Sequence, residues 1–97
     1  MFPVVEGDHL WGCVSTREIR QLPRNEWRNQ SVGSIATHCD PDNTVAPDDD
    51  ALQALATMNR TGRSRLLVAD GDRLVGILSL RDLLSLLAVK LELDKAA

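Results

Sequence analysis

The sequence predicts an α+β fold in which one strand–strand–helix unit occurs twice. In the clearer copy, residues 65–87, two short apolar runs flank an Asp-Gly turn, which is a strong signal for a β-hairpin. After the second run the apolar residues recur at helical spacing, and they are Leu80, Leu83, Leu84, Leu87 and Leu91. Together these patterns favour small mixed sheets packed against helices.

An internal repeat supports the same fold class. Residues 2–22 align with residues 66–86 at an offset of 64 without a gap, and eight of the 21 positions are identical. The matching glycines fall at the hairpin turn and below the start of the helix, where backbone freedom or close approach is needed. The identical pairs are Val4/Val68, Gly7/Gly71, Asp8/Asp72, Leu10/Leu74, Gly12/Gly76, Ser15/Ser79, Arg17/Arg81 and Leu22/Leu86.

Length and composition exclude several classes of function. With 97 residues the chain forms one small domain or two subdomains, and a net charge of −3 gives no strong attraction to nucleic acid. No signal peptide is visible, and no apolar run is long enough for direct membrane insertion. Two cysteines argue against a disulfide framework, and Cys13 aligns with a strand position expected to be buried. We therefore expect a cytoplasmic location, or the cytoplasmic face of a membrane protein.

Taken in order, residues 2–22 form the first hairpin and a short helix. Residues 23–30 are polar and begin with Pro23, which predicts a linker, and we expect Trp27 to anchor this linker on the core. Residues 31–37 have the composition of a short turn that leads into a loop.

A helix is predicted between a brief strand at residues 44–46 and Gly62. The carboxylates of residues 48–50 favour capping of free helix amides over a metal site, because three consecutive side chains do not converge on one ion. Gly62 is a natural helix stop. The expected buried stripe comprises Leu52, Leu55, Ala56 and Met58 or Asn59.

The final helix presents a second apolar face. Leu86, Val89 and Leu93 lie off the main leucine stripe. A domain of this size has no interior left for a second stripe, so this face predicts contact with the other unit or with another chain.

These elements resemble the CBS motif, the β-α-β-β-α module named after cystathionine β-synthase. The segments that carry the resemblance are residues 35–37 (IAT), 44–48 (TVAPD), 51–52 (AL), 65–68 (RLLV) and 70–84 (DGDRLVGILSLRDLL). By this resemblance the chain divides into a partial first motif at 1–22 that lacks its initial strand and helix, a linker at 23–30, and a complete second motif with a C-terminal helix at 31–97. A weaker likeness, in residues 23–27 and 87–93, is to the CBS pairs of site-two-type membrane zinc metalloproteases, although no HExxH motif is present.

The resemblance also implies a ligand site. CBS motifs act in pairs, and family members commonly bind AMP, ADP, ATP or S-adenosylmethionine in clefts between the two motifs. In the pattern Gly-x-x-[Ser/Thr]-x-x-Asp, the hydroxyl can meet a phosphate or ribose oxygen and the carboxylate can accept ribose hydroxyls. Ser79 and Asp82 match this pattern, whereas Glu18 replaces the aspartate in the first unit.

Each cleft in the family combines this pattern from one unit with the first-strand region of the other. The cleft with both halves present therefore pairs Ser15 and Glu18 with residues 35–37 and 63–66. The candidate ligand-binding residues are Ser15, Arg17, Glu18, Ile35, Thr37, Arg65, Ser79, Arg81 and Asp82. The alternative interpretation of Ser79 and Asp82 is ordinary helix capping.

The sequence thus predicts a non-catalytic regulatory module that senses an adenosine-type ligand and controls a partner domain or subunit. We expect the partner to be a larger enzyme or a membrane metalloprotease domain, and we expect that no cofactor is required. We expect no enzymatic activity, because no motif in the sequence pairs a nucleophile with a base. The alternative is a ligand-independent dimerisation or docking module, and we expect a homodimer because the sheet edge of the incomplete unit needs cover. A zinc site is disfavoured because the spacing of Cys and His matches no ligand pattern.

Overall fold

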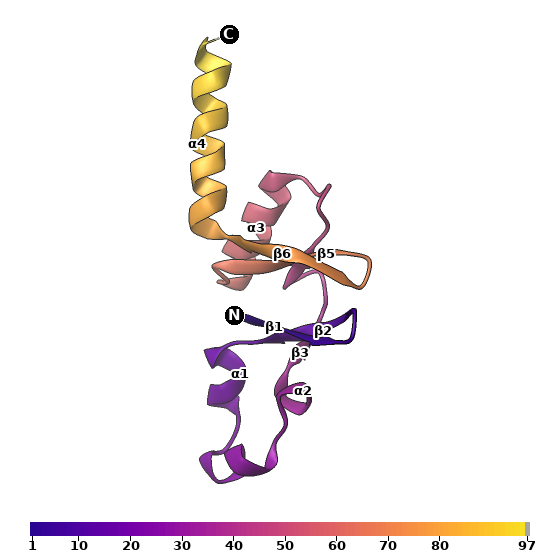
Figure 1. Cartoon of the computed structure of the whole chain (residues 1–97). Helices are drawn as coiled ribbons and strands as arrows, with labels where there is room; N and C mark the ends of the chain where they lie inside the picture. The colour runs from indigo at the N-terminus through magenta and orange to yellow at the C-terminus, as the bar shows by residue number, and fades with distance from the viewer. Residues whose placement is uncertain (97) are drawn as a thin grey trace.

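Two three-stranded sheets lie face to face in the computed structural model of the chain, which describes residues 1–96 (Figure 1). Helices α3 (Ala51–Thr61) and α4 (Leu80–Ala96) lie on the outer side of one sheet. Helices α1 (Thr16–Gln21) and α2 (Val32–Ile35) lie on the outer side of the other. The α+β class predicted from the sequence is confirmed.

The first sheet has the order β1-β2-β3. Strands β1 (Phe2–Glu6) and β2 (His9–Val14) pair antiparallel, and Gly7 supplies the left-handed φ of 59° in the turn between them. Strand β3 (Thr37–His38) pairs antiparallel with β2 opposite Gly12. A Cβ atom at Gly12 would overlap the backbone of β3, so only glycine permits this close pairing.

The second sheet has the order β4-β5-β6. Strand β4 (Thr44–Val45) runs parallel to β5 (Arg65–Asp70), and β6 (Arg73–Ser79) pairs antiparallel with β5 around Gly71. Helix α3 begins at the cap residue Asp50, whose side chain accepts a hydrogen bond from an amide of the first turn. The predicted repeated hairpins and the predicted start of α3 are therefore present.

Two apolar clusters hold the sheets and helices together. The cluster between the two sheets contains Leu10, Cys13, Leu67 and Ala69, which confirms that Cys13 is buried. The cluster between the second sheet and its helices contains Ala54, Met58, Leu66 and Leu83. Strand β5 contributes Leu67 and Ala69 to the first cluster and Leu66 to the second, because successive side chains of a strand point to opposite faces of the sheet.

The connection between β3 and β4 crosses from the first sheet to the second around a buried asparagine. The side chain of Asn43 is fully buried, and its Nδ2 donates to the carbonyl of His38 at 2.9 Å. Its Oδ1 accepts from the Asp40 amide at 3.0 Å, and its own carbonyl accepts from the Leu67 amide at 2.8 Å. Asn43 therefore satisfies the backbone groups that this crossing would otherwise leave unpaired.

The structure differs from the sequence prediction at residues 31–37. A helical turn, α2, and the strand β3 replace the expected turn and loop. The Ser31 side chain caps α2 by accepting from the Ser34 amide at 3.2 Å. Residues 37 and 38 were assigned to the second motif by sequence, yet they pair within the first sheet, so the two units interlock.

Two further side-chain predictions were wrong. Trp27 lies in the 3₁₀ helix η1 (Arg24–Asn29), is 49% exposed, and donates from Nε1 to the Leu22 carbonyl at 3.1 Å instead of reaching the core. The expected buried stripe of α3 is the second: Leu52 is 61% exposed and Ala56 is also exposed, whereas Ala54 and Met58 are the buried residues of this helix.

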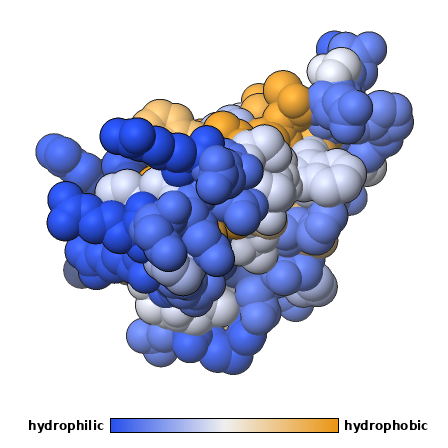
Figure 2. Space-filling view, turned by 90° about the horizontal axis from the view of Figure 1, so that it is seen from below, coloured by the Kyte–Doolittle hydropathy of each residue, from blue (hydrophilic) through white to orange (hydrophobic). Residues whose placement is uncertain are grey.

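The molecular surface is unevenly apolar. Figure 2, which views the end of the molecule that carries α1, η1 and α2, shows a mostly hydrophilic face with hydrophobic atoms along one edge. On α4, four large apolar side chains are more than half exposed, and they are Leu86, Val89, Leu91 and Leu93. None of the helices within residues 1–96 is long and apolar enough to span a membrane.

Candidate functional site

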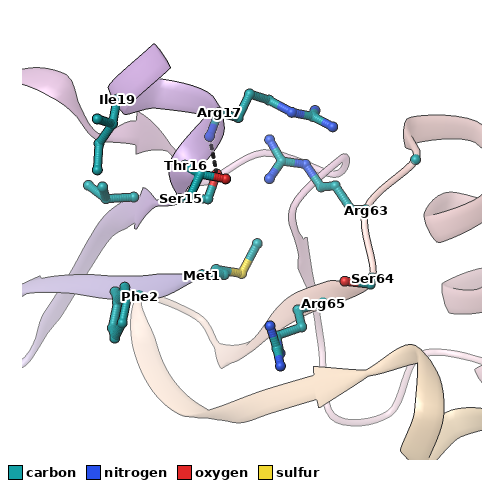
Figure 3. Close-up of a pocket in the computed structure, with 11 residues that line it drawn as sticks. Met1, Phe2, Ser15, Thr16, Arg17, Ile19, Arg63, Ser64 and Arg65 are labelled. Atoms are coloured by element: carbon teal, nitrogen blue, oxygen red, sulfur yellow. Dashed lines mark hydrogen bonds between the residues drawn. The ribbon is translucent and has the colours of Figure 1, made fainter. Parts of the chain in front are cut away.

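A cavity of about 390 Å³ lies where the first unit meets the start of β5 (Figure 3). One wall is formed by the first residues of β1, the end of β2 and the start of α1. The opposite wall is residues 62–65, which follow α3 and lead into β5. The lining residues are Met1, Phe2, Val14, Ser15, Thr16, Arg17, Ile19, Gly62, Arg63, Ser64 and Arg65.

Three arginines give this cavity a cationic lining. Arg17 projects from α1, while Arg63 and Arg65 come from the opposite wall (Figure 3). No carboxylate is among the lining residues. None of the three guanidinium groups forms an ion pair within the part of the chain that the structure describes. Within residues 1–96, their one hydrogen bond runs from Arg17 Nη2 to the Thr61 carbonyl at 3.4 Å. Their charges are therefore available to an anion.

The acid expected to line this cleft is turned away from the cavity. Glu18 is only 6% exposed, and its Oε2 accepts hydrogen bonds from the Ser15 amide and hydroxyl, each at 2.6 Å. Its Oε1 accepts from the Thr37 hydroxyl at 2.8 Å. Burial alone would raise the pKa of the Glu18 carboxyl, but the hydrogen bonds from Ser15 and Thr37 outweigh burial and lower this pKa.

The predicted residues of this cleft therefore separate into two groups. Ser15, Arg17 and Arg65 line the cavity. Glu18 and Thr37 bond to each other behind it, and neither they nor the half-buried Ile35 are among the lining residues. The Ser15 hydroxyl also accepts from the Arg17 amide at 3.3 Å, so it both caps α1 and lies on the cavity wall.

The three remaining predicted residues lie at the start of α4. The Ser79 hydroxyl accepts a hydrogen bond from the Asp82 amide at 3.1 Å, which is the capping interaction that the alternative interpretation predicts. Arg81 and Asp82 are exposed. None of the three lines the cationic cavity, so the structure does not bring the two serine motifs to one site.

One cavity arginine, Arg63, is not among the candidate ligand-binding residues, although it lies in the segment 63–66 that the sequence assigns to this cleft. Arg63 is half-buried and lies on the same wall as Arg65. The local sequence RTGRSR, residues 60–65, contains a signal that could have found it, because three arginines cluster around the glycine that ends α3. Among the described residues, no group of three or more His, Cys, Asp or Glu side chains is arranged to hold a metal ion.

Comparison with known families decides the identity of this fold. The sequence profile of the CBS domain matches residues 32–89, which is more than half of the chain. The chain belongs to the CBS domain family. The resemblance on which the sequence analysis relied is thus confirmed, and the profile covers α2 through most of α4.

Solved structures of other CBS proteins share the fold. A CBS-domain protein from Burkholderia ambifaria is 26% identical with a TM-score of 0.61, and the match covers 86% of this chain and 62% of that one. CBSX2, solved in complex with AMP, is 25% identical with a TM-score of 0.69 and coverages of 93% and 71%. OpuCA from Staphylococcus aureus, 22% identical with a TM-score of 0.61 and coverages of 92% and 72%, shows the fold alone.

The CBS chain is short beside these proteins, since it spans less than two thirds of the Burkholderia protein. Among curated protein sequences, none is similar enough to this chain to count as a match.

Proposed function

We propose that this CBS chain is a non-catalytic regulatory module that binds an adenosine-type ligand in the cavity between α1 and the start of β5. The observation that carries the proposal is the cavity itself, which is lined by the capping residue Ser15 and by three arginines that form no ion pair with a carboxylate of the described residues. The AMP complex of the related CBSX2 supports an adenosine nucleotide as the ligand class.

The apolar and the cationic lining residues of the cavity suit the two parts of such a ligand. Apolar side chains of β1, β2 and α1, including Phe2, Val14 and Ile19, offer contact area for a base. The arginines offer charge-assisted hydrogen bonds to phosphate oxygens. A ligand that contacts both walls would tie residues 62–65 to α1, and this is the change that a partner domain would sense.

The partner controlled in this way belongs to the same proposal. It is a domain or subunit of a larger enzyme, with a membrane metalloprotease domain as the specific case suggested by the likeness in residues 23–27 and 87–93.

Calorimetric titration of the full chain with AMP, ATP and S-adenosylmethionine tests the proposal. The variant Ser64→Trp places a large side chain on the cavity wall and should abolish binding, whereas Ser85→Trp on exposed α4 should bind like the wild type. Circular dichroism checks that both variants fold. If none of the three ligands binds at millimolar concentration, or if Ser64→Trp binds unchanged, this function is wrong.

A second candidate function is ligand-independent dimerisation through α3 and α4. A groove of about 320 Å³ between them is lined by Leu52, Leu86, Val89 and Leu93, with Asp50 and Lys90 also on its wall. The occupant we propose is the α4 helix of a second copy. A two-fold axis would pair Asp50 of each copy with Lys90 of the other, so the groove is self-complementary in charge as well as apolar.

Light scattering during size-exclusion chromatography separates this candidate from the first. A dimer that forms without nucleotide and is lost in Leu86→Asp supports it, and Ala88→Asp, on an exposed position of the same helix, serves as the matched control. A monomer at high micromolar concentration contradicts it.

A further inference from the structure

The charged residues that line the cavity indicate which adenosine-type ligands it binds most tightly. We propose that this cavity is a polyphosphate site, which holds its ligand by the phosphate chain and binds ATP and ADP more tightly than AMP and S-adenosylmethionine least of all. The inference rests on the proposed function for the place of the site, and it adds the chemical class that the site selects.

The first argument is that the cavity lining is positively charged although the chain as a whole is negatively charged. The chain carries a net charge of −3, with 14 acidic residues against 11 basic ones. The cavity nevertheless collects Arg17, Arg63 and Arg65 and has no acidic residue in its lining. A pocket lined by one sign of charge attracts ligands of the opposite sign, even where the whole protein repels them. Each added phosphate therefore finds an uncompensated positive charge, whereas the sulfonium of S-adenosylmethionine meets charges of its own sign.

The second argument is that no carboxylate within the described chain pairs with these arginines. The ion pair of Arg60 with Asp42 and the contact of His9 with Asp72 lie outside the cavity. Binding of an anion at the cavity arginines breaks no salt bridge. A guanidinium presents several N–H donors in a fixed plane and matches phosphate oxygens bidentately.

The third argument concerns how little the site offers to ribose. The carboxylate that follows the cavity residue Arg17 in the sequence is Glu18. Both of its oxygens already accept hydrogen bonds from Ser15 and Thr37. Glu18 is also 6% exposed and absent from the cavity lining, so this carboxylate is not placed to accept ribose hydroxyls. The sugar therefore adds less to affinity than the phosphates do, and a phosphate chain alone should bind.

Competition calorimetry on the full chain at low ionic strength tests the inference. The probes are ATP, ADP, AMP, S-adenosylmethionine and inorganic triphosphate, each titrated with and without Mg²⁺. We expect ATP to bind at least about tenfold more tightly than AMP, because one additional charge-assisted contact is worth roughly that factor. Inorganic triphosphate should displace ATP, and S-adenosylmethionine should not.

Charge-removing variants locate the effect. Arg63→Gln and Arg65→Gln should each weaken ATP about tenfold and AMP less, so the preference for ATP over AMP shrinks. Arg73→Gln makes the same change of charge on an exposed residue outside the cavity and should leave both affinities unchanged. Thermal denaturation of all three variants shows whether they fold.

The outcomes separate this inference from the proposed function. Equal affinities for ATP, AMP and S-adenosylmethionine would overturn the polyphosphate inference and leave an adenosine site standing. Triphosphate binding that is lost in Arg63→Gln, with no binding of any nucleotide, would support the anion site and overturn the adenosine function. Absence of binding by every probe would overturn both.

Discussion

The hydroxyl of Thr37 donates a 2.8 Å hydrogen bond to the carboxylate of Glu18, which joins strand β3 to helix α1 across 19 residues of chain. The same carboxylate accepts from the Ser15 amide and hydroxyl. One buried acid therefore fixes the start of α1 and holds the third strand on the first sheet. It also places Ser15 on the wall of the cationic cavity.

Replacement of Glu18 by glutamine should lower stability and flatten its dependence on pH. Hydrogen bonds keep the pKa of the folded carboxyl below its usual value despite burial, so the charged form stabilises the fold at neutral pH. This contribution is present above the unfolded pKa and is lost as pH falls through the lower folded pKa. We expect Glu18→Gln to reduce the free energy of unfolding by about 1 to 3 kcal/mol at neutral pH.

Urea denaturation at neutral pH and at several values below the usual pKa of glutamate measures both effects. The exposed Glu26 in η1 supplies the control, and Glu26→Gln should behave like the wild type at each pH. Parallel stability curves for Glu18→Gln and the wild type would contradict the role given to this carboxylate.

The equivalent glycines of the two repeats should respond differently to alanine. A Cβ at Gly12 would overlap the Thr37 carbonyl, whereas a Cβ at Gly76 would meet no atom within 4 Å. Gly12→Ala should therefore push β3 off β2 and destabilise the protein by about 2 kcal/mol or more. Gly76→Ala should be neutral or slightly stabilising, because alanine restricts the unfolded chain. Thermal melts of the two variants measure the contrast, and similar melting temperatures would disprove it.

This contrast also shows what the sequence can predict. The hairpins and helix starts are local: an Asp-Gly turn, a change of apolar period and a capping residue lie within a few positions of the structure they determine. The repeat identifies Gly12 and Gly76 as equivalent positions, but only the structure shows that Gly12 has a third strand beside it whereas Gly76 does not. A two-residue strand such as β3 has no periodicity, and long-range pairing determines its position.

The sequence indicated some features of the candidate site and missed others. The resemblance to the CBS family assigned Ser15, Arg17 and Arg65 to one cleft, and the structure places all three in the lining of one cavity, because their positions follow from the repeat and the order of the strands. It did not predict that Glu18 turns inward. The bonds to Ser15 form a local capping box, which the Ser-x-x-Glu spacing could have indicated, whereas the bond to Thr37 requires β3 to lie beside α1. The resemblance also placed Ser79 and Asp82 in a binding role, while the structure gives Ser79 a capping bond to the Asp82 amide.

Replacement of Asn43 by alanine should loosen the crossing between the sheets. The Asn43 side chain is fully buried and bonds to the His38 carbonyl and the Asp40 amide, so its loss leaves buried backbone groups unpaired. We expect Asn43→Ala to lower the free energy of unfolding by about 2 kcal/mol. Chemical denaturation measures the loss, with Asn59→Ala on exposed α3 as the control. Equal effects of the two substitutions would refute a special role for Asn43.

The two cysteines should report separately on the surface and on the contact between the sheets. Cys39 is exposed, whereas Cys13 is fully buried between the sheets, and burial raises the pKa of its thiol. Since the thiolate is the reactive form, iodoacetamide should modify Cys39 quickly and Cys13 only when the sheets separate. Mass spectrometry over time measures both rates.

A ligand that joins the walls of the cavity should slow Cys13 labelling and leave the Cys39 rate unchanged, because it favours the state in which the two sheets are packed together. Rapid labelling of Cys13 in the native protein would contradict the packing between the two sheets.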